Sequence, residues 1–194
     1  MKKTLLLGIG NILISDEGIG IHVINHIKSN SISEQDYDIL DGGTGGFNLL
    51  YIISEYENVI IVDAIMDKEK TGTISVRHPK YSKDYPDMLS AHDFGLKAMI
   101  DSLIFMNKLP NIIIVTVSIN CSLKEIKLDI SSELKKSMSK ICNITEYVTT
   151  TVIKYREKHG NYISHNRLPE IYRYALNRNK NHLIEKNLII DLVQ

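Results

Sequence analysis

The stretch Val59-Ile60-Ile61-Val62-Asp63 decides the fold class, because four consecutive apolar residues of high strand propensity end at a carboxylate. A run that is apolar at every position predicts a strand covered on both faces, as in a parallel sheet. Three further strands are expected at Leu5–Leu7, Tyr37–Leu40 and Ile112–Val117, and the last of these is again a buried run.

Apolar residues repeat at helical spacing between these strands. The predicted helical stripes are Gly20, Val23, Ile24 and Ile27; Leu49, Ile52, Ile53 and Tyr56; Leu96, Met99, Ile100 and Leu103; and Met138, Ile141, Cys142, Thr145, Val148 and Val152. Strands that alternate with helices form βαβ units. We therefore expect an α/β fold of three layers, α/β/α, around a mainly parallel, twisted sheet.

Two segments depart from this alternation. Thr73–Val76 alternates between polar and apolar residues, which predicts a half-buried, antiparallel edge strand. From Lys154 to Lys180, seven basic residues oppose two acidic ones, a local charge of +5. We expect residues 1–153 to form the α/β domain and residues 154–194 a basic, helical C-terminal extension packed on it. Whether that extension is only a solvated face or also docks an acidic partner segment stays open.

The overall composition argues against several classes of protein. The 23 Lys and Arg residues balance the 23 Asp and Glu residues, so no global charge favours nucleic acid or an anionic membrane. The apolar runs fall far short of the ~20 residues of a membrane helix. The start Met1-Lys2-Lys3 leads directly into a strand without a signal-peptide pattern. We expect a cytoplasmic protein, a monomer or weak homo-oligomer, that binds neither nucleic acid nor membrane.

Polar residues follow the predicted strands at the edge where a parallel sheet collects its ligands. They are Asn11, Asp16 and Glu17 after the first strand, Asp41 and Thr44 after the second, Asp63 after the third, and His92 in the first turn of a later helix. Such oxygen and nitrogen donors suit a borderline divalent ion. A helix N-terminus disfavours imidazolium, and only neutral imidazole binds a metal. The alternative, a surface His92 that helps to cap its helix, stays open at this point.

Other motifs carry less weight. Gly8 and Gly10 invite a dinucleotide-binding interpretation, but Leu13 stands where the fingerprint needs a third glycine. A nucleotide- or flavin-binding module is therefore the weaker hypothesis. His22 and His26 share a helix face without a third ligand nearby, so we expect a solvated flank.

The two cysteines also carry little functional weight. Cys121 and Cys142 lack metal or redox spacing, and we expect both to be buried structural thiols.

Four segments together resemble one family. The segment Leu7–Gly20 closely resembles the N-terminal motif of hydrogenase maturation endopeptidases. Asp41–Thr44, Val62–Ala64 and Ser90–Leu96 are similar to that family's second, third and histidine segments, in the right order. The resemblance covers the chain from about Leu5 to near Val152. It implies an endopeptidase that removes the C-terminal extension from the nickel-loaded precursor of a [NiFe] hydrogenase large subunit.

The resemblance also implies roles for individual residues. Glu17, Asp63 and His92 would form the metal-binding and catalytic set, with nickel supplied by the precursor. Another divalent ion can occupy the site in isolation. Asp41 is a further catalytic candidate, and whether the metal or one of the carboxylates activates water stays open. The residues expected to bind substrate are Asn11, Asp16, Gly42, Gly43 and Thr44, and Asp16 should also shape its loop.

Two alternatives to this activity remain. One is a nickel-dependent checkpoint protein that binds the precursor without cutting it. The other is a protease of the same fold with another protein substrate, since a fold does not determine a function.

Overall fold

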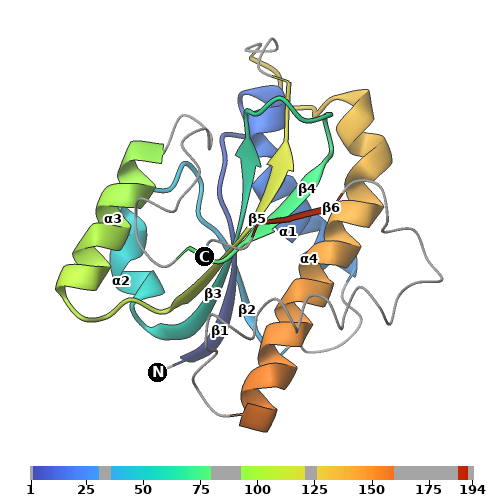
Figure 1. The fold of residues 1–194 in the computed structure, drawn as a ribbon. Coiled ribbons are helices and arrows are strands. Elements are labelled where there is room, and N and C mark those ends of the chain that lie inside the picture. Colours follow the sequence, from blue (N-terminus) through green and yellow to red (C-terminus); the bar gives the residue numbers. More distant parts are fainter. Residues whose placement is uncertain (1, 31–35, 80–92, 121–125, 160–187, 192–194) are drawn as a thin grey trace.

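The computed structural model describes residues 2–30, 36–79, 93–120, 126–159 and 188–191 (Figure 1). Within these residues one six-stranded sheet has the order β2-β1-β3-β5-β4-β6. Its strands are β1 (Lys2–Gly8), β2 (Asp38–Asp41), β3 (Tyr56–Ile65), β4 (Ile74–Arg77), β5 (Asn111–Ser118) and β6 (Leu188–Asp191). The four strands predicted from the apolar runs are β1, β2, β3 and β5, so that prediction is confirmed.

These four strands are mutually parallel, and their carboxyl ends therefore lie at one edge of the sheet. Strand β1 pairs in parallel with both β2 and β3, and β3 pairs in parallel with β5. In this register Gly8 lies between Asp41 on β2 and Val62 on β3. Asp63 thus stands one residue beyond that row. We call this edge of the sheet the carboxyl rim.

The other side of the sheet differs in direction. Strand β4 runs antiparallel to β5, as the alternating segment Thr73–Val76 predicts. Residues 188–191 then add β6 in parallel with β4. For these four residues the expected helical extension is wrong. The physical reason is that a strand edge offers unpaired backbone donors and acceptors, and the apolar run Leu188–Ile190 can pair with them.

Helices cover both faces of the sheet, which confirms the predicted three layers (Figure 1). The helices α1 (Ile19–Asn30) and α4 (Ser132–His159) pack on one face. The short η2 (Phe47–Leu49) and α2 (Leu50–Ile53) pack on the other face together with α3 (Asp93–Phe105). None of the helices in the described part of the chain is both long and apolar enough to cross a membrane.

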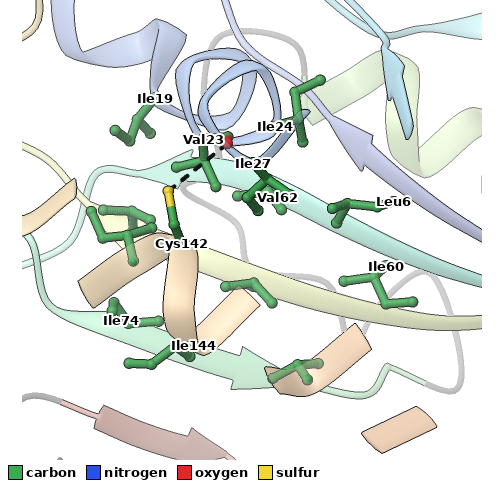
Figure 2. Packing of buried hydrophobic residues seen from close by; sticks show 14 of the residues in the cluster. Leu6, Ile19, Val23, Ile24, Ile27, Ile60, Val62, Ile74, Cys142 and Ile144 are labelled. Carbon is green, nitrogen blue, oxygen red and sulfur yellow. Dashed lines mark hydrogen bonds between the residues drawn. The ribbon is translucent and has the colours of Figure 1, made fainter. Parts of the chain in front are cut away.

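The core on the α1/α4 face shows how the strand side chains alternate (Figure 2). Ile60 and Val62 point into this cluster, where they meet Ile19, Val23, Ile24 and Ile27 of α1. The thiol of Cys142 on α4 donates to the carbonyl oxygen of Val23 at 3.9 Å, and burial raises the pKa of this thiol to about 12. Cys142 is therefore the buried thiol that the sequence predicts, whereas Cys121 lies outside the described residues.

The other side chains of β3 pack on the opposite face of the sheet. Val59 and Ile61 belong to the second cluster, which contains Leu96, Met99 and Ile100 of α3. Because successive strand residues point to opposite faces, Asp63 follows Val59 and Ile61 toward the α2/α3 layer.

Candidate active site

The loop between β1 and α1 is held against the sheet by glycines that allow close backbone approach. A Cβ atom at Gly20 would lie 2.2 Å from the carbonyl oxygen of Val62 on β3. A Cβ atom at Gly10, which has a φ of 152°, would lie 2.2 Å from the carbonyl oxygen of Glu17. No other residue fits at either position without a shift of the backbone. The sequence therefore brings the η1 turn (Ser15–Gly18), with Asp16 and Glu17, directly against β3.

Backbone hydrogen bonds join the loops that follow β1, β2 and β3. Ile9 donates to the carbonyl oxygen of Val62 at 2.9 Å, and Gly10 donates to that of Gly43 at 2.8 Å. These bonds link the first sequence motif to the third and to the second. The structure thus assembles three of the four motif segments at the carboxyl rim.

Glu17 and Asp63 are both buried at this rim. Among the described residues, the Oε2 atom of Glu17 has no hydrogen-bond partner. The Oδ1 atom of Asp63 accepts a hydrogen bond from the backbone N–H of Ala64 at 2.7 Å. A buried carboxylate oxygen without a donor is unfavourable unless a cation or another donor approaches it. Glu17 therefore fits the metal-binding role that the family resemblance implies for it.

Asp16 shares one feature with Glu17, because its Oδ2 atom is also buried without a hydrogen-bond partner among the described residues, but its other oxygen is fixed. Its Oδ1 atom accepts a hydrogen bond from the backbone N–H of Ser131 at 2.6 Å, at the start of α4. The hydroxyl of Ser131 caps the same helix by accepting from the N–H of Leu134 at 3.3 Å. This contact supports the expectation that Asp16 shapes its loop, and its expected contact with substrate stays a prediction.

The catalytic candidate Asp41 and the remaining residues predicted to bind substrate lie in turns around the rim. Asp41 is exposed at the end of β2, and its Oδ1 atom accepts from the N–H of Gly43 at 2.8 Å. Asn11 makes a similar turn, in which its Oδ1 atom accepts from the N–H of Leu13 at 3.0 Å. Thr44 is exposed, and Gly42 is half-buried between the two loops. A Cβ atom at Gly43 would meet no atom within 4 Å, so this loop has open space above it.

His92 lies outside the described residues, one position before the first residue of α3. That helix ends at Phe105 and β5 begins at Asn111, so the link between them is short. Because β5 runs parallel to β3, α3 must run from the carboxyl rim to the opposite edge, as Figure 1 shows. Asp93, at the start of α3, is therefore on the rim side. Among the described residues alone, no three His, Cys, Asp or Glu side chains form a metal-binding group.

The predicted environment of His22, a solvated helix flank, is wrong. His22 was expected there together with His26, and His26 is indeed exposed, but His22 is half-buried. Burial lowers the pKa of His22, while Asp129, Asp16 and a hydrogen bond to the backbone of Leu128 oppose that shift. Asp129 and Leu128 come from a segment more than 100 residues away, so local spacing gives no signal for these two contacts.

Comparisons with known proteins agree with this arrangement. The family model for the hydrogenase maturation protease HycI matches residues 21–147. The hydrogenase 2 maturation protease of Escherichia coli is 34% identical over 110 residues, which are 56% of this chain and 67% of that protein. The hydrogenase expression/formation protein HupD of Rhizobium leguminosarum is 32% identical over 112 residues, which are 56% of this chain but only 54% of that protein.

A solved structure is similar over most of the chain. The hydrogenase maturating endopeptidase HybD from Escherichia coli superposes with a TM-score of 0.67 at 25% sequence identity. The match covers 81% of this chain and 94% of that one. The sheet and its helical layers are therefore those of a known fold.

Proposed function

Because this chain belongs to the hydrogenase maturation protease family, we propose that it removes the C-terminal extension of a [NiFe] hydrogenase large-subunit precursor that carries nickel. The observation that most directly supports the proposal is the buried Glu17 Oε2 atom, which has no donor among the described residues and lies on a turn packed against β3. An unpartnered anionic oxygen in that position is suited to recognise a cation that arrives with the substrate.

In this proposal Glu17 and Asp63 recognise the nickel of the precursor, and His92 is the third donor. Carboxylate and imidazole groups are suitable ligands for a borderline divalent ion such as nickel. When bound, a divalent ion polarises a peptide carbonyl and lowers the pKa of an adjacent water. The residues expected to bind substrate, in the loops after β1 and β2, hold the substrate chain so that its scissile bond lies beside these carboxylates.

Asp41 is the carboxylate that we assign to proton transfer. It is exposed at the same rim, and one of its oxygens is fixed by the N–H of Gly43 at 2.8 Å. The hydrogen bond orients the carboxylate, and the exposure gives water access to it. A carboxylate that is held in place and is accessible to water can act as a general base. Asp16, in contrast, is buried and accepts a hydrogen bond from Ser131.

The test is the intact mass of a nickel-loaded precursor before and after incubation with the protein. We expect one discrete C-terminal loss with the natural chain and none with Glu17→Gln, Asp63→Asn or His92→Ala. Asp101→Asn is the matched control, because Asp101 is an exposed carboxylate on α3. Its cleavage should equal that of the natural chain.

Each other outcome of this test has a distinct meaning. Equal cleavage of nickel-free precursor would contradict the nickel dependence. Tight binding of the nickel-loaded precursor without any cleavage would favour a checkpoint protein instead of a protease. Cleavage that survives all three substitutions would contradict the assignment of the site.

A further inference from the structure

The carboxyl rim exposes four large aliphatic side chains, which we call the rim patch. They are Ile12 (40% exposed), Leu13 (55%), Ile126 (91%) and Leu128 (65%). Single exposed apolar residues are ordinary, but a group of them on one surface marks an interaction site. The question is whether these four side chains form one surface, because they come from two loops more than 100 residues apart.

Backbone hydrogen bonds join the two loops side by side. Lys127 donates to the carbonyl oxygen of Leu13 at 3.0 Å, and Ser15 donates to that of Lys127 at 2.7 Å. These bonds form a parallel β-bridge between Ile14 and Lys127. Residues that flank a bridge point to the side opposite the bridged pair. Leu13 and Ile126, which precede the two bridged residues, are therefore neighbours on one face, and Leu128, which follows Lys127, points to the same side. Ile12 stands in the same turn as Leu13 and adjoins this face.

Hydrogen bonds of the Ser15 and Asp16 side chains also join the two loops. The hydroxyl of Ser15 donates to the carbonyl oxygen of Asp129 at 3.0 Å. Asp16 accepts from the N–H of Ser131 at 2.6 Å, so the same pair of loops is joined again at the start of α4. The aliphatic side chains thus stand on a backbone that is already ordered. A partner that binds a preorganised surface avoids the entropy loss of ordering it.

The rim patch is continuous with the candidate active site. The N–H of Asn11, next to Ile12, donates to the carbonyl oxygen of Glu17 at 3.2 Å. The carboxylate expected to recognise nickel and the aliphatic surface therefore belong to one loop. The nearby charges are partly paired, since Lys135 and Asp129 form an ion pair of 3.1 Å. The exposed Lys127 stands between Ile126 and Leu128, so the surface disfavours a basic segment, and its aliphatic side chains favour an aliphatic one.

We propose that the rim patch docks an aliphatic segment of the large-subunit precursor that lies close to the scissile bond. This inference rests on the proposed function and adds to it a substrate-binding surface outside the metal-binding residues. The rim patch contributes to the affinity for the precursor. The carboxylates and His92 carry out the cleavage itself.

The chain offers a matched control for this proposal. Phe105 is 92% exposed, almost the same exposure as Ile126, but it stands at the end of α3. That end lies at the edge of the sheet opposite the carboxyl rim (Figure 1). A general effect of removing an exposed apolar side chain should appear equally in Phe105→Ser. An effect that is specific to the rim patch should be absent from Phe105→Ser.

The test compares the double variant Ile126→Ser/Leu128→Ser with Phe105→Ser and the natural chain in cleavage of the nickel-loaded precursor. We expect the double variant to raise KM by roughly tenfold, since two exposed aliphatic anchors are lost, with kcat unchanged. Phe105→Ser should leave both constants unchanged. An unaltered KM in the double variant, or an equal rise in Phe105→Ser, would overturn the proposal.

Two further measurements separate this proposal from the proposed function and from other occupants. If the natural chain does not cut the precursor, the affinity of each variant for intact precursor is measured by calorimetry. Weaker binding by the double variant alone would support docking even if the proposed cleavage fails. Sedimentation tests a second copy of the chain as the occupant. A dimer lost only in the double variant, with precursor binding unchanged, would overturn the proposal.

Discussion

Asp16 accepts a hydrogen bond from the backbone N–H of Ser131 at 2.6 Å, and this contact joins the loop after β1 to the start of α4. The positive end of a helix dipole favours a carboxylate at its N-terminus. The adjacent residue, Glu17, belongs to the proposed metal-binding set. The start of α4 is thus part of the support for the candidate active site, although α4 contributes no residue to the proposed set.

We predict that Asp16→Ala lowers the free energy of unfolding by about 1–3 kcal/mol, because the half-buried N–H of Ser131 loses its acceptor. Asp16→Asn is the control, since its amide oxygen can still accept that hydrogen bond. Urea unfolding of the three proteins measures the difference. If Asp16→Ala is as stable as the natural chain, the contact does not hold the loop.

Gly20→Ala should be more destabilising than Gly43→Ala. A Cβ atom at Gly20 would lie 2.2 Å from the Val62 carbonyl oxygen, which is backbone and cannot rotate away. We expect a loss of about 3 kcal/mol or failure to fold. Gly43 has a φ of 55° but open space around it, so alanine there should cost about 1 kcal/mol. Thermal unfolding distinguishes the two, and equal losses would contradict the close packing of α1 on β3.

Cys142 should be unreactive in the folded protein. Burial raises the pKa of its thiol from 9.0 to about 12, and only the thiolate reacts with disulfide reagents. In a Cys121→Ser background we expect no reaction at about pH 8 until urea is added. Rapid reaction without urea would contradict the packing of α4 on α1.

The same raised pKa of Cys142 affects stability at high pH. The unfolded thiol ionises near pH 9.0, whereas the folded thiol keeps its proton to about pH 12. Stability from this group is therefore present below pH 9.0 and is lost as the pH rises toward 12. Cys142→Ala should show a shallower decline of the urea midpoint in that range. An identical decline would exclude Cys142 as its source.

His22 should make the protein less stable in mild acid. Because burial lowers its pKa from 6.5, the unfolded chain takes up a proton near pH 6.5 before the folded chain does. Stability from neutral His22 is present above that pH and is lost as the pH falls through the lowered pKa. His22→Gln should flatten the decline of the urea midpoint below about pH 6.5. His26→Gln, at an exposed position of the same helix, should not.

Periodic patterns predicted much of this fold because they report burial directly. The run Val59–Val62 and the stripe from Leu96 to Leu103 each mark residues that the structure buries. The stripe from Leu49 to Tyr56 was partly misleading. The helix α2 ends at Ile53, and Tyr56 instead begins β3 and donates to Asp38 on β2 at 2.6 Å. A contact between strands decided that boundary, and a single helical stripe cannot show it.

The candidate site was predictable to a similar extent. Strand ends indicated where Glu17, Asp41 and Asp63 lie, because parallel strands bring their carboxyl ends to one edge. The environment of His22 and the bridge between Ile14 and Lys127 were not predictable. Both depend on contacts across more than 100 residues. No local spacing records such contacts.

The pairing of β6 with β4 affects the order in which the sheet forms while the chain is being synthesised. Residues 188–191 leave the ribosome long after β4 and β5 have done so. During that interval the outer side of β4 has no β6 to pair with, and an unpaired strand edge can capture a strand from another chain. Sheet completion is therefore a late event, and until it occurs the outer edge of β4 in a newly made chain is exposed to pairing with other chains.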